Sequence, residues 1–275
     1  MAVQSKIFSV NKTLKVKGQI LHLATPKVMG IVNITPDSFY SGSRFTNISG
    51  ILKKVESMID EGADLIDVGG YSSRPGALDI TQEEELDRVI PAVTAIRTNF
   101  PNAIISIDTF RSRVAREAIR EGADMVNDIS GGDLDPHMIR TVADLKVPYI
   151  AMHMRGTPQT MNQLTQYENV TKEVIDYFQR KLLAFRKAGI TDVIVDPGFG
   201  FAKTVAQNFE LLGSLELFQI LERPLLVGLS RKSMIWRTLN STPELALNGT
   251  TALNAIALMK GATLLRVHDV REARE

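Results

Sequence analysis

The chain has 275 residues, of which 44% are hydrophobic and 23% charged, and its formal net charge is +1. This is the composition of an ordinary globular protein, and the near-zero charge excludes a broadly basic surface for nucleic acid. The absence of cysteine excludes disulfides, thiolate metal sites and cysteine nucleophiles.

The N-terminal region predicts a β-hairpin and no targeting segment. Residues Ile7 to Leu23 alternate between apolar and polar side chains, and we expect them to cross the bottom of a larger domain. The first ten residues lack the apolar stretch of a secretory signal, and no apolar run approaches the roughly 18 residues of a membrane span. We therefore expect a cytoplasmic protein with no membrane or nucleic-acid partner.

Short apolar runs recur along the rest of the chain. Most are nearly continuous, as expected for strands that are buried on both faces. The eight runs are Val28 to Val32, Leu65 to Val68, Ile104 to Ile107, Met125-Val126, Tyr149 to Met152, Val193 to Val195, Leu225 to Leu229, and Leu264 to Val267.

Amphipathic segments such as Ile51 to Asp60 and Asn169 to Lys187 separate these runs. Several end in glycine just before the next run, as at Gly62, Gly122 and Gly189. Glycine adopts the left-handed conformation that ends a helix, so the loop to the next strand can be short. Repeated helix-glycine-strand units predict parallel strands joined by helices.

Eight such units match the roughly 250 residues of a (β/α)₈ TIM barrel. We therefore predict an α/β fold in which residues 1–275 form a single TIM-barrel domain. A doubly wound open sheet is the alternative, although it would usually use fewer strands. Only a few residues follow Val267, so we expect the eighth helix to be truncated.

Polar residues stand at the ends of the apolar runs. In a barrel these positions converge on the C-terminal mouth, where such enzymes place their chemistry. Any one of them could merely cap a helix or pair with a neighbour. As a set they are costly to bury unless they bind something. They are Asn33, Asp67, Asp108, Asn127, Asp128, His153, Asp196, Ser230, Arg231, Lys232, Arg266 and His268.

These motifs, in this order, resemble the dihydropteroate synthase family from about Val28 to Val270. The family makes dihydropteroate from a pterin pyrophosphate and p-aminobenzoate. The matching segments are Met29–Phe39, Asp67–Gly70 with Ser73–Ala77, Ser106–Thr109, Asn127–Gly131, Met152–Met154, Asp196–Phe201, Ser230–Lys232 and Arg266–Asp269.

The resemblance implies a pterin site at the mouth. Asp108, Asn127, Asp196 and Lys232 would bind the polar edge of the ring, because a pterin offers N–H donors to carboxylates and a carbonyl oxygen to an ammonium group. Met152 and Phe201 would pack against its faces, although both residue types are also common in a plain core. His153 is more consistent with a structural role than with a catalytic one.

The resemblance also implies sites for the leaving group and the second substrate. Pyrophosphate would be bound by Asn33, Arg74, Arg266 and His268, with Asn33 also a ligand of Mg²⁺, the expected cofactor. Phe39, Ser73, Pro75 and Ser230 would form the p-aminobenzoate pocket, which sulfonamide inhibitors would share. One departure is Tyr71-Ser72-Ser73, where many relatives have Glu-Ser-Thr.

The implied reaction displaces pyrophosphate from a CH₂ group of the dihydropterin. Asp37, Lys232, Arg266 and His268 are the candidate catalytic residues, Asp37 near the developing cation and the cations near the leaving group. We expect the loops 34–46 and 71–78 to close only over bound ligands, and we expect a homodimer. Two alternatives are a pterin-binding methyltransferase that uses methyltetrahydrofolate and a non-catalytic pterin-binding homologue.

Overall fold

The computed structural model describes residues 12–34, 44–72 and 79–275. Its first element is an antiparallel hairpin of β1 (Thr13–Val16) and β2 (Gln19–His22). Lys17 and Gly18 form the turn, both with positive φ (52° and 76°), as in the two-residue turns that match the twist of paired strands. The predicted hairpin is confirmed from Thr13 onward, and its expected start at Ile7 lies outside the described residues.

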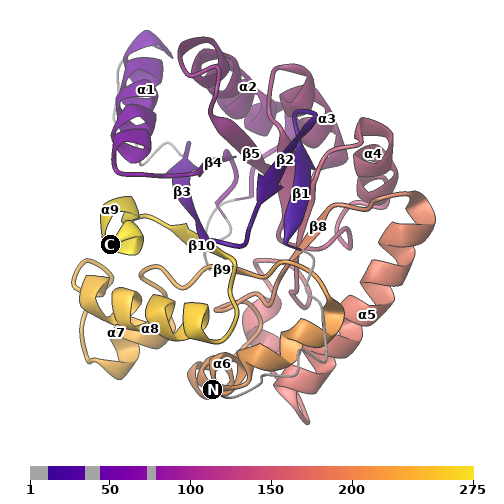
Figure 1. The fold of residues 1–275 in the computed structure, drawn as a ribbon, viewed down its shortest axis with the longest axis vertical. Helices are drawn as coiled ribbons and strands as arrows, with labels where there is room; N and C mark the ends of the chain where they lie inside the picture. Colours follow the sequence, from indigo (N-terminus) through magenta and orange to yellow (C-terminus); the bar gives the residue numbers. More distant parts are fainter. Residues whose placement is uncertain (1–11, 35–43, 73–78) are drawn as a thin grey trace.

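Eight parallel strands form the barrel (Figure 1). They are β3 (Lys27–Asn33), β4 (Leu65–Gly69), β5 (Ile104–Asp108), β6 (Met125–Asp128), β7 (Tyr149–Met152), β8 (Val193–Asp196), β9 (Leu226–Val227) and β10 (Leu264–Val267). The hydrogen-bonded order is β8-β7-β6-β5-β4-β3-β10-β9. A parallel bridge between Val195 and Leu225 joins the two ends, which confirms the barrel and excludes the open sheet.

Helices surround the strands (Figure 1). The α-helices are α1 (Arg44–Asp60), α2 (Gln82–Asn99), α3 (Ser112–Arg120), α4 (Met138–Leu145), α5 (Val170–Ala188), α6 (Val205–Gly213), α7 (Ser233–Thr238), α8 (Leu247–Met259) and α9 (Val270–Arg274). Within the described residues, the 3₁₀ segments are η2 (Met161–Gln163) and η3 (Leu215–Leu221). No helix of the described part of the chain is both long and apolar enough to cross a membrane.

Glycines end the helices as the sequence predicts. Gly189 has φ 92° and its N–H bonds to carbonyl oxygens of the last turn of α5. Gly62, Gly122 and Gly261 also have positive φ where a helix gives way to a strand. The connections from these helices to the strands that follow them are therefore short.

The hairpin closes the N-terminal end of the barrel. Leu14, Val16 and Leu23 are buried in one cluster with residues near the starts of the barrel strands, including Met29 and Met125. A hydrogen bond of 3.0 Å from the Lys15 N–H to the Asp192 carboxylate fixes the hairpin at this end. The predicted position across the bottom is therefore confirmed.

The last helix, α9, has five residues, Val270–Arg274. Its first residue, Val270, is fully buried and lies beside Gly30 of β3. One buried contact thus anchors the last helix to the first barrel strand.

Candidate active site

A partly buried network of charged and polar side chains joins β4, β5, β6 and β10 toward the C-terminal end of the barrel. The Arg266 Nε atom lies 2.6 Å from Asp67 Oδ2, and its Nη2 atom lies 2.5 Å from Asp108 Oδ2. Asn127 Nδ2 donates to the same Asp67 oxygen at 3.0 Å. Strands far apart in sequence therefore bring four polar side chains together, three of which the sequence assigned to ligand binding.

Asp67 lies at the centre of this network, and sequence reasoning gave it no role. It is fully buried inside β4. Because a carboxylate only accepts hydrogen bonds, Asn127 must turn its NH₂ group toward Asp67. The Asn127 carbonyl oxygen is then left to accept from a ligand. Asp67 Oδ1 has no partner within the described residues, and a carboxylate inside an apolar strand was the signal that could have revealed this role.

The network sets the charges at the mouth. Burial raises the pKa of Asp108 to about 7, against the opposing effect of Arg266 and with a further increase from Asp67. Burial would lower the pKa of Arg266, but Asp67 and Asp108 outweigh it and raise that pKa. Arg266 is therefore a permanent cation, whereas Asp108 can change its charge near neutral pH.

A second pair, Asp196 and Lys232, lies at the ends of β8 and β9. Burial raises the pKa of Asp196, opposed by the Lys232 charge, and burial lowers the pKa of Lys232 to about 8, opposed by Asp196. The ammonium group of Lys232 also donates to the Phe199 carbonyl and lies 4.9 Å from the centre of the Phe201 ring.

Apolar side chains lie next to these charges. Met152 is 3% exposed and belongs to a cluster with Ile129, Met154 and Ala202, against which Phe201 packs. The structure thus places Met152 and Phe201 in one apolar wall beside Lys232, where a flat ring can meet both polar and apolar groups.

Ser230 and His268 are in direct contact. His268 Nδ1 and Ser230 Oγ are 3.1 Å apart, and the His268 backbone N–H donates to the same oxygen at 3.1 Å. Next to them, Arg231 forms two hydrogen bonds with the Asp269 carboxylate, of 2.9 and 2.8 Å. A residue assigned to p-aminobenzoate and one assigned to pyrophosphate are therefore neighbours, and Arg231 joins the loops that carry them.

Some predicted site residues cannot be placed. Asp37, Phe39, Ser73, Arg74 and Pro75 lie outside the described residues, as do residues 35–43 and 73–78, which make up most of the loops whose closure is expected. Asn33 is described and is the last residue of β3, in register with Gly69 of β4. Among the residues that can be placed, no group of three or more His, Asp or Glu side chains could hold a metal by itself.

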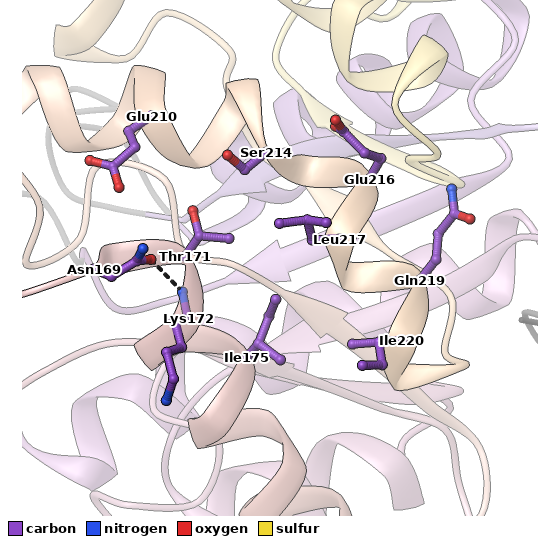
Figure 2. Close-up of a pocket in the computed structure, with 10 residues that line it drawn as sticks. All are labelled: Asn169, Thr171, Lys172, Ile175, Glu210, Ser214, Glu216, Leu217, Gln219 and Ile220. Carbon is purple, nitrogen blue, oxygen red and sulfur yellow. Dashed lines mark hydrogen bonds between the residues drawn. The ribbon is translucent and has the colours of Figure 1, made fainter. Parts of the chain in front are cut away.

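An outer groove is unrelated to this site. It has a volume of about 440 Å³ and lies between α5 and the segment formed by α6 and η3 (Figure 2). Leu217 and Ile220 line it and are largely exposed. None of the polar side chains at the strand ends lines the groove, so the chemistry belongs to the barrel mouth.

Comparison with known families shows which proteins this chain is similar to. A sequence profile described as "Pterin binding enzyme" matches residues 29–268. The chain is 44% identical over 261 residues to dihydropteroate synthase of Escherichia coli K12, covering 94% of this chain and 92% of that protein. It is 45% identical over 246 residues to dihydropteroate synthase of Synechocystis, covering 88% and 85%.

Solved structures agree. The chain is similar to Xanthomonas albilineans dihydropteroate synthase with 4-aminobenzoic acid, with a TM-score of 0.89, 40% identity and coverage of 96% of this chain and 94% of that one. It is equally similar to the Yersinia pestis enzyme in complex with a sulfonamide drug, with a TM-score of 0.89, 40% identity and 95% coverage of both chains. A Xanthomonas albilineans complex with 7,8-dihydropteroate has a TM-score of 0.85 at 38% identity, again with 95% coverage of both chains.

Proposed function

The chain belongs to the pterin-binding enzyme family, and on that premise we propose that it is a dihydropteroate synthase. It joins 6-hydroxymethyl-7,8-dihydropterin pyrophosphate to p-aminobenzoate and releases 7,8-dihydropteroate and pyrophosphate, a transferase step of folate synthesis. Relatives of this name align over nearly the whole chain.

The observation that carries this proposal is the partly buried set of donors and acceptors at the mouth. Asp67, Asp108, Asn127 and Arg266 form one hydrogen-bonded group. Such a group is costly to bury unless a ligand pairs with its remaining hydrogen-bond donors and acceptors. A pterin edge, with its N–H donors, ring nitrogens and carbonyl oxygen, offers complementary atoms to carboxylates, an amide and an ammonium group.

Asp108, Asn127 and Asp196 accept from the N–H groups of the pterin in this proposal, and Lys232 donates to its carbonyl oxygen. Met152 and Phe201 pack against the ring. Arg266 uses Nε and Nη2 for the two carboxylates, so Nη1 is the atom that can meet pyrophosphate. His268 and Asn33 complete the leaving-group site, with Arg74 as the remaining candidate.

In the reaction, the bond between the pterin CH₂ carbon and the pyrophosphate oxygen breaks and a carbon–nitrogen bond to the arylamine forms. The pyrophosphate takes the bonding electron pair, and the amine nitrogen loses one proton to solvent. An arylamine is already neutral at pH 7, so no strong base is needed. Arg266 and His268 stabilise the charge of the leaving group, while Asp37 would lie near the electron-poor carbon.

Mg²⁺ is the proposed cofactor, and the donor set fits it. The side-chain amide oxygen of Asn33 is the kind of single protein ligand that Mg²⁺ accepts when phosphate oxygens and water supply the others. The bound ion would neutralise part of the pyrophosphate charge. A site of this kind needs no cage of carboxylates, in keeping with the residues at the described part of the mouth.

The second substrate would occupy the space beside Ser230, where Phe39, Ser73 and Pro75 complete the pocket. The Ser230 hydroxyl is buried and already held by His268, so it can meet the carboxylate of p-aminobenzoate at a fixed position. A sulfonamide carries the same aniline and would compete for this pocket, as expected from the drug complex of the Yersinia pestis relative.

We also propose a cytoplasmic homodimer. Helix α8 exposes Ala252, Ala255, Ile256 and Met259 at helical spacing, and the last two side chains are 39% and 89% exposed. An apolar helix face of this kind favours burial against a second copy. Light scattering should give twice the mass of the chain, and Met259→Glu should shift the protein toward monomer.

One assay tests the activity. Purified protein should release pyrophosphate only when the pterin pyrophosphate and p-aminobenzoate are both present, and dihydropteroate should form in equal amount. Methyl transfer from methyltetrahydrofolate in place of pyrophosphate release would show the methyltransferase alternative. Pterin binding without turnover would show the non-catalytic one.

A further inference from the structure

Lys203 is a buried cation with no part in the reaction described so far. It is 8% exposed and follows the β8 loop of residues 196–202. Its Nζ atom lies 3.0 Å from His153 Nδ1, 3.0 Å from the Gly198 carbonyl oxygen and 3.1 Å from the Phe201 carbonyl oxygen. An ammonium group has three N–H donors, so these three acceptors satisfy it completely.

Burial is the main influence on the protonation of both Lys203 and its partner His153. Burial, and then the Lys203 charge, lower the pKa of His153 well below its ordinary value, so the ring is neutral and Nδ1 can accept. Burial lowers the pKa of Lys203 to about 7, while the nearby Asp196 carboxylate opposes that effect. The pair therefore combines a neutral acceptor with a donor that is costly to bury unless its hydrogen bonds are satisfied.

The β8 loop has a backbone that would not hold this shape alone. Gly198, Gly200 and Ala202 have φ values of 72°, 79° and 48°. The left-handed conformation is unfavourable for alanine, and such residues persist where surrounding contacts fix them. Lys203 supplies two of those contacts by binding the carbonyls of Gly198 and Phe201.

The same loop carries the pterin contacts. The Gly198 N–H donates to Asp196 Oδ1 at 2.8 Å, which leaves Asp196 Oδ2 for a ligand. The His153 backbone N–H donates to the Asp196 carbonyl at 3.0 Å. His153 therefore fixes the loop at Asp196, and Lys203 fixes it at Gly198 and Phe201.

We propose that Lys203, through His153 and the carbonyls of Gly198 and Phe201, is a positioning residue that presents Asp196 and Phe201 to the pterin. This inference rests on the proposed function. It differs from a general stabilising role because it acts on one substrate. Removal of the ammonium group should weaken pterin binding and leave p-aminobenzoate binding at saturating pterin nearly unchanged.

The test compares Lys203→Met with Lys260→Met. Lys260 also donates to a backbone carbonyl, that of Gly213 at 2.7 Å, but at the closed end of the barrel. Lys203→Met should raise the KM for pterin pyrophosphate at least tenfold and the calorimetric Kd by a similar factor, with the KM for p-aminobenzoate within twofold. Lys260→Met should change none of these. Unchanged pterin affinity in folded Lys203→Met, or an equal rise in both KM values, overturns the proposal.

His153 variants decide the matter if Lys203→Met does not fold. His153→Gln keeps an acceptor and should alter pterin affinity less than threefold, whereas His153→Leu should reproduce the tenfold loss. Equal pterin affinities of the two variants overturn the proposal. The wild-type titration with pterin pyrophosphate is run first, and failure of that titration would count against the proposed function instead.

Discussion

The carboxylate of Asp67 holds the guanidinium of Arg266 through a hydrogen bond of 2.6 Å, formed between two strands that lie 199 residues apart in the sequence. The same Asp67 oxygen also accepts from Asn127. One fully buried side chain thereby orients both a cation proposed to bind pyrophosphate and an amide proposed to bind the pterin. Loss of this carboxylate should affect stability and ligand binding together.

Asp67→Ala leaves Arg266 with Asp108 as its remaining carboxylate partner. Breaking a buried ion pair from one side costs about 3 kcal/mol or more in the free energy of unfolding. We also expect the KM for pterin pyrophosphate to rise at least tenfold, because Asn127 is free to rotate. Urea unfolding and steady-state kinetics measure the two effects.

The matched control for this prediction is Asp64→Ala. Asp64 binds Lys27 at 2.9 Å and the Val28 N–H at 2.9 Å at the closed end of the barrel. Its loss should lower the free energy of unfolding by about 1–2 kcal/mol without changing KM. If Asp67→Ala affects stability alone, as Asp64→Ala does, then Asp67 does not orient the site.

Pterin affinity should depend on pH through Asp108. Its pKa is raised to about 7 in the free protein, chiefly by burial, with Arg266 opposing and Asp67, Glu85 and Asp128 adding to the rise. The N–H donors of a pterin need the ionised carboxylate, so affinity should increase from pH 6 to about 7. Above pH 7 the loss of charge from Lys203 and Lys232, whose pKa values burial lowers to about 7 and about 8, should oppose a further increase. Calorimetry in buffers of different ionisation enthalpy should detect proton release on binding. Asp108→Asn should bind weakly at every pH and lose this dependence.

The same group predicts how stability changes with pH. The folded-state pKa of Asp108 lies above its unfolded value of about 3.9, so the folded protein binds the proton more tightly. Its contribution to stability is complete below about pH 4 and is lost as the pH rises toward 7. The unfolding free energy of the wild type minus that of Asp108→Asn should therefore decrease as the pH rises from 4 to 7. A difference that stays constant between pH 4 and 7 contradicts the raised pKa.

Gly198→Ala should disrupt the β8 loop. A Cβ atom at this position would lie 2.0 Å from the His153 carbonyl oxygen, and φ is 72°. We expect a loss of at least about 2 kcal/mol in unfolding free energy. Gly213→Ala is the control, since an added methyl group at the end of α6 would have no atom within 4 Å. That change should be neutral or stabilising by about 0.5–1 kcal/mol, and equal effects in both variants would exclude the steric explanation.

Activity should require a divalent ion. Chelation should abolish pyrophosphate release, and Mg²⁺ should restore it, because the leaving-group charge is otherwise met by Arg266 and His268 alone. Asn33→Ala should raise the Mg²⁺ concentration for half-maximal activity at least fivefold. Full activity after complete removal of divalent ions would show that the protein cations suffice.

Much of the fold could be predicted because the signals are local. Continuous apolar runs mark strands that are buried on both faces, and Gly62, Gly122 and Gly189 mark helix ends. The predicted run Leu225 to Leu229 is wrong in its extent, since β9 covers only Leu226–Val227. Ser230 to Lys232 follow closely, and Arg231 has a positive φ. The backbone therefore stops pairing with the sheet after Val227, and the next residues form part of the barrel mouth.

The sequence predicted which residues form the candidate site better than it predicted which of these residues contact one another. The positions of Asp108, Asn127, Asp196 and Lys232 follow from strand ends and from the family motifs. The bridging role of Asp67 and the contact between Lys203 and His153 depend on side-chain distances between different strands, which no sequence spacing encodes. Arg266 shows what the sequence did not predict. The family motif assigned it only to pyrophosphate binding, whereas in the structure it also binds the carboxylates of Asp67 and Asp108.

The hairpin of β1 and β2 limits the routes by which substrates enter the barrel and products leave it. Because Leu14, Val16 and Leu23 fill the closed end, both substrates and both products must pass through a single entrance. In the proposed arrangement the pterin and p-aminobenzoate both bind at this one mouth, so the substrate that binds second covers the path by which the first would leave. Product release has to clear this entrance before the next turnover begins.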